Sequence, residues 1–209
     1  MNDTIQGIGN KMTEFSTGAK RDIQEDKGRC DLMPLSVIGI IYDYWNSNNQ
    51  KLIDKLDSNN YVRLQLSNIE NYIFTGNINN LCNVVCYAML SNENWHSNQD
   101  GCNSYNCIYT ELGQMFMDVS KHFKRGAEKY GEWNWNKGIP LHSFIDSATR
   151  HLLKWIGNWN DERHDLAFIW NIICCLHTQL FLCNPELMDL PFCKNIDFGG
   201  KENERKEQN

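Results

Sequence analysis

The chain has 209 residues and a formal net charge of −6, with 41% hydrophobic and 22% charged residues. This length suits one well-cored domain, and the composition is that of a globular protein, which argues against disordered, collagen-like and membrane-embedded classes. The acidic balance, with a pI near 5.5, disfavours a protein that binds long nucleic acids, but small phosphorylated ligands remain open. We therefore predict one domain over residues 1–198 and a polar, mobile tail over 199–209.

The chain also carries signals about its location. Its longest apolar run, Leu35 to Tyr42, is far too short to cross a bilayer, and its N-terminus begins with polar residues and not with a basic and then an apolar segment. We therefore expect a cytoplasmic protein with no membrane partner.

Nine cysteines are present, and in a reducing compartment they are expected to remain free thiols. The close pairs Cys82/Cys86 and Cys102/Cys107 lie on either side of His96, but their spacings do not fit a zinc knuckle. Cys82 and Cys86 are better explained as small buried residues one helical turn apart. No zinc site is predicted.

The N-terminal half is expected to begin with an arm. The first thirty residues are polar, charged and punctuated by glycine, which predicts an ordered or semi-ordered arm without a helix. After Pro34, apolar residues from Leu35 to Trp45 have helical spacing and predict a mostly buried helix. Residues 46–106 are rich in Asn and Ser, which predicts short helices joined by loops, and we interpret 46–111 as an insertion within the domain.

The C-terminal half begins with a clear amphipathic pattern. Apolar residues from Leu112 to Phe123 predict a helix that ends near Gly126. The next segment, 129–140, is predicted to be a loop by its glycines, asparagines and proline, although it also carries two tryptophans and two lysines.

Two further helices are predicted after this loop. The first covers 141–156, with Gly157 as its C-terminal stop, and the second begins around Asp161, capped by Asn160 or Asp161. No segment alternates with period two over the length of a strand, so the predicted fold class is all-α.

The helix predicted over 141–156 carries candidate ligand-binding residues. His142, Asp146 and Arg150 occur at i, i+4 and i+8 and share one stripe, with His151 beside it. This stripe is compatible with a ligand-facing carboxylate and guanidinium. An ion pair between Asp146 and Arg150 on the surface is equally compatible with the spacing.

The last predicted helix opens with an ExxD pair, Glu162 and Asp165, which would lie on one face of its first turn. Small carboxylate sets of this kind hold Mg²⁺ together with substrate phosphates. Acidic residues are also favoured in any first helical turn by the helix dipole. Asn171 falls on a different face from Asp165, so it need not serve the same ligand and is also compatible with capping a neighbouring element.

A third group combines basic and aromatic residues. Focal basic charge in an acidic chain, beside aromatic rings that can stack on a base, is what a nucleotide pocket requires. A solvated arm and tryptophans buried in the core would give the same composition. The residues are Lys20, Arg21, Lys27 and Arg29 in the arm, and Lys129, Trp133, Asn134, Trp135 and Lys137 in the 129–140 loop.

Several enzyme classes lack their signatures in this chain. There is no GxSxG elbow and no Walker or Rossmann glycine pattern, and Cys174 and Cys175 lie within an apolar helix. The sequence therefore offers no convincing nucleophile.

A series of blocks occurs in a specific order over residues 14–45 and 112–180. They are Thr17–Asp22, Lys27–Pro34, Gly126–Gly131, Asn134–Trp135, Lys137–Pro140, Asp146–Ala148, Arg150–Leu152, and His164 with Ala167 and Trp170–Asn171. In this order the chain resembles the dATP/dGTP diphosphohydrolase N-terminal domain family, a phage-rich group related to the MazG-like all-α nucleotide pyrophosphohydrolases. The resemblance implies a MazG-like helical bundle core, with 46–111 as a helical or loop insertion.

The resemblance also implies a chemistry. Carboxylates on the helices would hold Mg²⁺, or Mn²⁺, which bridges a nucleoside triphosphate that is cleaved between its α and β phosphates. Asp146, Glu162 and Asp165 would be the catalytic and metal-binding residues. The related enzymes usually show ExxE on the helix where this chain has only Asp146, followed by Arg150 and His151. The metal set is therefore one carboxylate short.

Two functions remain open on this basis, with a ligand-free structural phage protein as a third. The first is a Mg²⁺-dependent pyrophosphohydrolase of purine (d)NTPs, encoded by a phage and acting in the bacterial host cytoplasm. The second is an inactive sponge, without a metal cofactor, that sequesters a signalling nucleotide of antiviral defence, of the cyclic ADP-ribose or cyclic oligonucleotide type. A homo-oligomer is expected in either case. The expected phosphate-binding residues are Lys20, Arg21, Lys27, Arg29, Lys129, Lys137 and Arg150, and the expected base-binding residues are Trp133, Asn134, Trp135 and His151.

Overall fold

A computed structural model describes residues 12–22, 27–55, 60–91 and 105–195. The described part is dominated by helices, which confirms the predicted all-α class. The α-helices are α1 (Leu35–Asp54), α2 (Tyr61–Thr75), α3 (Ile78–Ser91), α4 (Tyr105–Tyr130), α5 (Leu141–Ile156) and α6 (His164–His177). Short 3-10 turns lie at η1 (Cys30–Leu32), η2 (Asn134–Lys137), η4 (Pro185–Leu187) and η5 (Pro191–Asn195), and a π turn, η3 (Thr178–Leu182), extends α6.

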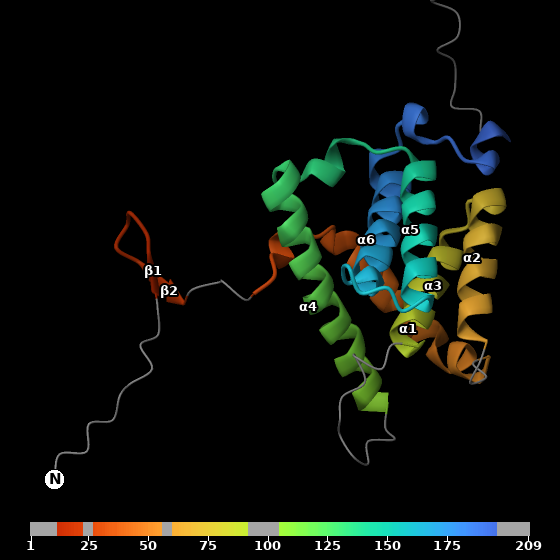
Figure 1. The fold of residues 1–209 in the computed structure, drawn as a ribbon, viewed down its shortest axis with the longest axis horizontal. Helices are drawn as coiled ribbons and strands as arrows, with labels where there is room; N and C mark the ends of the chain where they lie inside the picture. The colour runs from red at the N-terminus through yellow and green to blue at the C-terminus, as the bar shows by residue number, and fades with distance from the viewer. Residues whose placement is uncertain (1–11, 23–26, 56–59, 92–104, 196–209) are drawn as a thin grey trace, which may run out of the picture.

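The helices form one body around α6. Figure 1 shows α5 and α6 side by side, with α4 on one side of the pair and α2 on the other, while α1 and α3 contact the buried faces of this group. In α6, twelve of fourteen residues are buried, and α3 contributes eight more. A helix that is apolar on nearly all sides belongs in the centre of a core, and these two helices occupy it.

The apolar character of α6 revises one expectation from the sequence. The segment His164–Leu182 consists of α6 and η3 together. By length and composition it is apolar enough to cross a membrane, because an 18-residue window within it has a mean hydropathy of 1.4. The sequence analysis considered only the uninterrupted apolar run Leu35 to Tyr42, which is too short to cross a membrane. However, 67% of that window is buried inside the protein, as in the core helix of a soluble protein, so the finding is weak evidence for a membrane span.

Most predicted elements of the C-terminal half are present, with shifted ends. Helix α5 has the predicted bounds, and Gly157 is its C-cap. Helix α4 continues past Gly126 to Tyr130, and α6 begins at His164, not near Asp161, with Arg163 as its N-cap. The predicted start of the last helix was therefore wrong, because it lies about one turn before the start of α6.

The N-terminal half departs further from the prediction. Helix α1 continues to Asp54, beyond the predicted end near Trp45. The arm contains an antiparallel hairpin, β1 (Met12–Glu14) and β2 (Lys20–Asp22), which lies apart from the helices in Figure 1. Three-residue strands are too short to show a period of two, which is why the sequence did not reveal them.

The interval 46–111 was predicted to be an insertion, and that interpretation stays a prediction. Helix α3 lies within it, and its residues Leu81, Val84 and Val85 are fully buried in the shared core. This part of the interval is thus integral to the core and is not an appended subdomain.

The described cysteines are free, as expected: Cys30, Cys82, Cys86, Cys174, Cys175, Cys183 and Cys193. Cys82 and Cys86 are buried in α3, and burial raises the pKa of the Cys82 thiol to about 12, so it is an inert core residue. The side chains of His96, Cys102 and Cys107, and the tail 199–209, lie outside the described residues.

The segment before η1 is fixed against α4 by a close backbone approach. The Arg29 backbone N–H donates to the Ser120 carbonyl at 3.2 Å, and Gly28 lies directly on the same turn of α4. A Cβ added at Gly28 would collide with Ser120 Oγ and lie 2.7 Å from the Lys121 backbone nitrogen. Only glycine allows this approach.

We therefore expect Gly28→Ala to lower the free energy of unfolding by about 1–3 kcal/mol, because the backbone of α4 cannot yield to the added methyl group. Urea denaturation followed by circular dichroism measures the change. Gly39→Ala in α1 is the control, since a Cβ there meets nothing within 4 Å and alanine favours a helix. Equal stability of the two variants would contradict the close approach.

Candidate functional site

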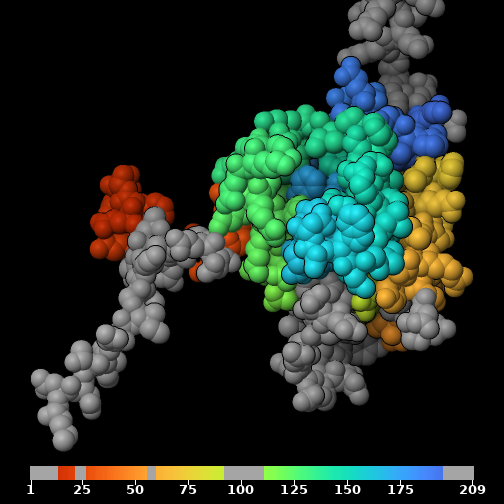
Figure 2. Space-filling model, viewed as in Figure 1, coloured from red at the N-terminus to blue at the C-terminus, as the bar shows by residue number. Residues whose placement is uncertain are grey.

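The most enclosed hollow among the described pockets is a cavity of about 370 Å³ between α4, α5 and α6. Figure 2 shows it as a depression between α4 and α5, with atoms of α6 at its floor. The connection from Gly131 to Ile139 and the Leu32 side chain of η1 close it on the remaining sides. Six aromatic residues contribute to its walls: Phe123, Tyr130, Trp133, Trp135, Phe144 and Trp170.

Two tryptophans of the 129–140 loop have different roles here. Trp135 is buried, and its Nε1–H donates to the Leu32 carbonyl at 3.1 Å while its ring packs on Phe123 and His177. Trp133 is 43% exposed and lies in the left-handed region at φ 59°. Trp135 thus holds the loop against the core, whereas Trp133 remains available at the open side of the cavity.

Two residues that line the cavity, His122 and Trp170, also carry buried polar atoms without partners. His122 Nδ1 and Trp170 Nε1 are buried and have no hydrogen-bond partner within the described part of the chain, and their rings are 5.8 Å apart. A buried donor or acceptor without a partner is energetically costly, so these two atoms are unusual for the interior of a protein. Asn171 also lines the cavity, and its side-chain amide donates to the Ala167 carbonyl of its own helix, so it caps no neighbouring element in this arrangement.

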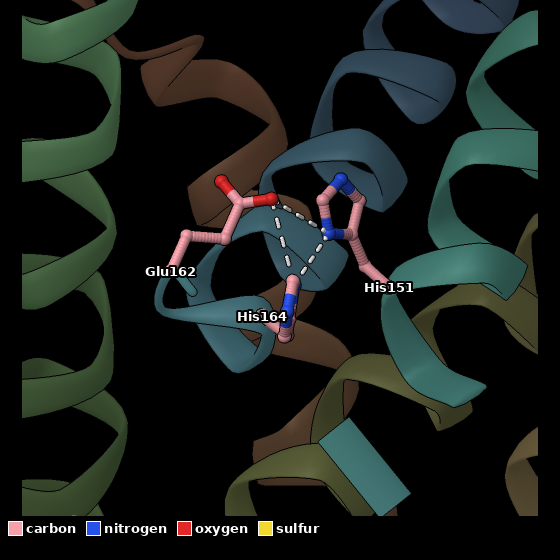
Figure 3. Close-up of side chains that lie close together, drawn as sticks. All are labelled: His151, Glu162 and His164. Carbon is pink, nitrogen blue, oxygen red and sulfur yellow. Dashed lines mark hydrogen bonds and ion pairs between the residues drawn. The ribbon is translucent and has the colours of Figure 1, made fainter. Parts of the chain in front are cut away.

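A cluster of histidines and acids adjoins the cavity at His151. The turn from α5 to α6, with Asn158 left-handed at φ 54°, brings Glu162 and His164 against His151 of α5. Figure 3 shows the three side chains directed at one another. The two Nδ1 atoms are 3.0 Å apart, and Glu162 Oε1 is 3.5 Å from each of them. We call these three residues the His–Glu cluster.

Beyond this cluster lies a second, more open hollow of about 530 Å³. Glu162 and His164 line it together with Arg125 and Arg163. Because His151 lines the aromatic cavity and contacts His164, the two hollows meet at the His–Glu cluster.

Burial sets the charge state of the histidines at this junction. It lowers the pKa of His122 to about 4, with a further lowering from the nearby Arg125 charge. Burial also lowers the pKa of His151. Both rings are therefore mainly neutral at pH 7.

The carboxylates predicted to bind a metal are not brought together. Asp146 is exposed and pairs with Arg150 on the surface of α5, as in the ion-pair alternative. Asp165 is buried and accepts hydrogen bonds from Arg163 Nε and Nη2 at 2.9 and 2.6 Å. Glu162 precedes α6, so the prediction that it shares a helical face with Asp165 was wrong. This arrangement does not fit a Mg²⁺ ion held by these three carboxylates, and dependence on Mg²⁺ or Mn²⁺ stays a prediction.

The stripe on α5 is likewise not directed into the cavity. The backbone N–H of His142 donates to Asp189 Oδ1 at 2.9 Å, and its ring pairs with the same carboxylate. Of the residues considered on this helix, His151 is the one that lines the cavity.

The expected phosphate-binding residues are dispersed. Lys20 and Arg21 lie on the hairpin strand β2, and Lys27 is exposed before η1. Arg29 pairs with Asp31 and, at 2.8 Å, with Glu132. Among the described residues that line the aromatic cavity there is no Lys or Arg, so Lys129, Lys137 and Arg150 are also outside it.

The expected base-binding residues, unlike the expected phosphate-binding residues, lie together. Trp133, Asn134, Trp135 and His151 all line the aromatic cavity. The structure adds His122, which is on the buried edge of α4 one turn before Gly126 and which the sequence analysis had not considered. Its position three residues after the buried Val119 could have indicated that it faces inward.

Comparison with known proteins supports the family assignment. Residues 92–189 match the family model described as dATP/dGTP diphosphohydrolase, N-terminal. No curated protein and no solved structure matches the chain. The match confirms the predicted family resemblance over 92–189, just under half of the chain, and the family name is that of a nucleotide hydrolase.

The matched range can be compared with the structure. It contains α4, α5, α6, the His–Glu cluster and, except for Leu32, the lining of the aromatic cavity. It begins inside the interval 46–111 and does not include the N-terminal blocks at 14–45, whose resemblance stays a prediction.

The neutral His122 predicts a pH effect on stability. The pKa of His122 is about 4 in the folded chain, whereas the ordinary pKa of a histidine is 6.5. Between pH 6.5 and pH 4, the unfolded chain therefore takes up a proton that the folded chain does not. We expect the free energy of unfolding to fall by up to about 3 kcal/mol as the pH drops from 6.5 to 4. Urea titrations in EDTA at several pH values measure it, with His122→Gln losing this part of the decline. A parallel decline in both proteins would show that His122 is not its source.

Proposed function

We propose that the chain binds a purine nucleoside triphosphate across the two hollows and hydrolyses it to the monophosphate and pyrophosphate. The observation that carries this proposal is that an aromatic cavity and a hollow lined by Arg125 adjoin each other at the His–Glu cluster. The match to the dATP/dGTP diphosphohydrolase family supports the substrate class.

The base is assigned to the aromatic cavity. Trp133 offers an exposed ring for stacking, and Asn134 and Asn171 provide amides that can distinguish purine edges. Polar atoms of this kind fix the orientation of a ligand in an otherwise apolar site.

The phosphates are assigned to the second hollow. Arg125 and Arg163 line it beside Glu162 and Asp165, and because Arg163 is paired with Asp165, Arg125 is the cation that we assign to the phosphates. The Glu162 carboxylate lies at the junction, and one of its oxygens is able to take a proton from an attacking water. Attack on the α phosphorus would break its bond to the oxygen that bridges to the β phosphate and release pyrophosphate.

A sponge that holds the nucleotide without turnover is the second candidate. It is favoured by the ion pairs Asp146–Arg150 and Asp165–Arg163, which engage two of the three expected catalytic carboxylates. In this proposal the same two hollows bind a cyclic signalling nucleotide.

The two candidates are separated by incubating the purified chain with Mg²⁺ or Mn²⁺ and a panel of dNTPs and cyclic nucleotides. Chromatography before and after heat denaturation then identifies the products. Monophosphate and pyrophosphate in solution support the hydrolase, while a nucleotide that returns intact after denaturation supports the sponge. A panel in which nothing is depleted or cleaved would refute both.

Stacking on Trp133 predicts that Trp133→Ala weakens nucleotide binding by roughly tenfold or more, as expected for the loss of one base–aromatic stack. Isothermal titration calorimetry measures the affinity. Phe74→Ala is the matched control, because Phe74 is an exposed aromatic residue on α2, 64% accessible and far along the chain from the cavity lining. Equal affinities for the two variants would remove Trp133 from the site.

The assignment of the phosphates predicts a charge-selective effect of Arg125→Gln. This variant should lose affinity for the triphosphate but keep its affinity for the corresponding nucleoside, because only the triphosphate reaches the second hollow. Arg63→Gln on α2 removes the same charge elsewhere and should change neither affinity. A loss that is equal for nucleoside and triphosphate would contradict the assignment.

A further inference from the structure

The His–Glu cluster has the composition of a transition-metal site. It combines two imidazole nitrogens with one carboxylate oxygen, and the three ligand atoms lie within 4.8 Å of one another. Two histidines and one carboxylate are the three protein ligands of many catalytic zinc sites and of non-haem iron sites. Hard Mg²⁺ prefers oxygen ligands, so this set differs in kind from the carboxylates that the family resemblance implied.

The two distances from Glu162 fit coordination better than hydrogen bonding, whereas the two Nδ1 atoms lie at a distance that suits either. Glu162 Oε1 is 3.5 Å from each Nδ1, which is long for an N–H···O hydrogen bond. Ligand atoms that share a tetrahedral ion at Zn–N lengths of about 2.0–2.1 Å are separated by roughly 3.3 Å. The three separations, 3.0, 3.5 and 3.5 Å, surround that value, so one centre can lie at bonding distance from all three atoms.

The surroundings hold one of the ligands in a coordinating orientation. Asp161 Oδ1 lies 2.7 Å from His164 Nε2, and Lys154 Nζ contacts the other oxygen of Asp161 at 3.2 Å. A carboxylate that receives the distal N–H of a histidine fixes its tautomer, which leaves the lone pair of Nδ1 for a metal. His164 itself is 2% exposed, so its ring is held by packing as well.

We propose that His151, Glu162 and His164 bind a first-row transition dication of the Zn²⁺ class, with Asp161 as a positioning residue for His164. Three protein ligands leave a fourth position open, and the neighbouring hollow with Arg125 and Arg163 gives an anion or a water access to it. The site is assigned from its ligands alone and does not require that the chain hydrolyses nucleotides.

The test uses the full chain, stripped with EDTA, and Co²⁺ as a spectroscopic probe. We expect one Co²⁺ per chain, visible d–d bands of a low-coordinate ion, no thiolate-to-cobalt charge-transfer band in the near ultraviolet, and displacement by Zn²⁺ but not by Mg²⁺. Absence of binding, or bands from cysteine ligands, would overturn the proposal.

Variants locate the ion. Glu162→Gln removes a ligand from an exposed position and should weaken Co²⁺ binding at least tenfold, and Asp161→Asn should weaken it about 10–100-fold. His142→Ala is the control, because His142 pairs with Asp189 on another part of the surface and should leave the affinity unchanged. An affinity that is unaffected in Glu162→Gln, or lost equally in His142→Ala, would refute the site.

This outcome is independent of the proposed function. Co²⁺ binding without any nucleotide retained or cleaved would establish the metal site and refute the nucleotide proposal. Nucleotide binding without Co²⁺ binding would do the reverse.

Discussion

The buried Trp135 side chain is the interaction on which the shape of the candidate site depends. Its Nε1–H reaches the Leu32 carbonyl of η1, and its ring lies against Phe123 of α4 and His177 of α6. One residue of the loop thus joins three segments that are distant in the chain. Because a large ring buried with its N–H satisfied is strongly held, the loop is fixed where it closes the cavity. Trp133, two residues earlier, is thereby presented at the open side.

The turn between α5 and α6 has the corresponding role for the polar part of the site. Helix α5 ends at Gly157, and the chain reverses through Asn158 before α6 begins at His164. This reversal lays α6 along α5 and places Glu162 and His164 over His151. The aromatic cavity and the second hollow share this cluster as a wall, so a few residues of local structure shape both hollows.

Local signals were sufficient for much of the fold. Helix α5 was predicted with its true bounds because its apolar spacing is regular and glycine follows it directly. The start of α6 was misplaced, because Asp161 is a favourable N-cap by residue type but is engaged by His164 and Lys154 in the structure. The hairpin was missed since two strands of three residues leave no periodic pattern.

What the sequence by itself determined is the helical class, the family resemblance now matched over 92–189, and the grouping of Trp133, Asn134 and Trp135, which line one cavity. These follow from spacing and from residue order, which are local properties of the chain. Only the tertiary structure decided which charged groups are engaged with each other. Asp146 and Asp165 face arginines, whereas His151, Glu162 and His164 converge from two helices and a turn. Such convergence depends on how α5 packs against α6, and no spacing along one helix can express it.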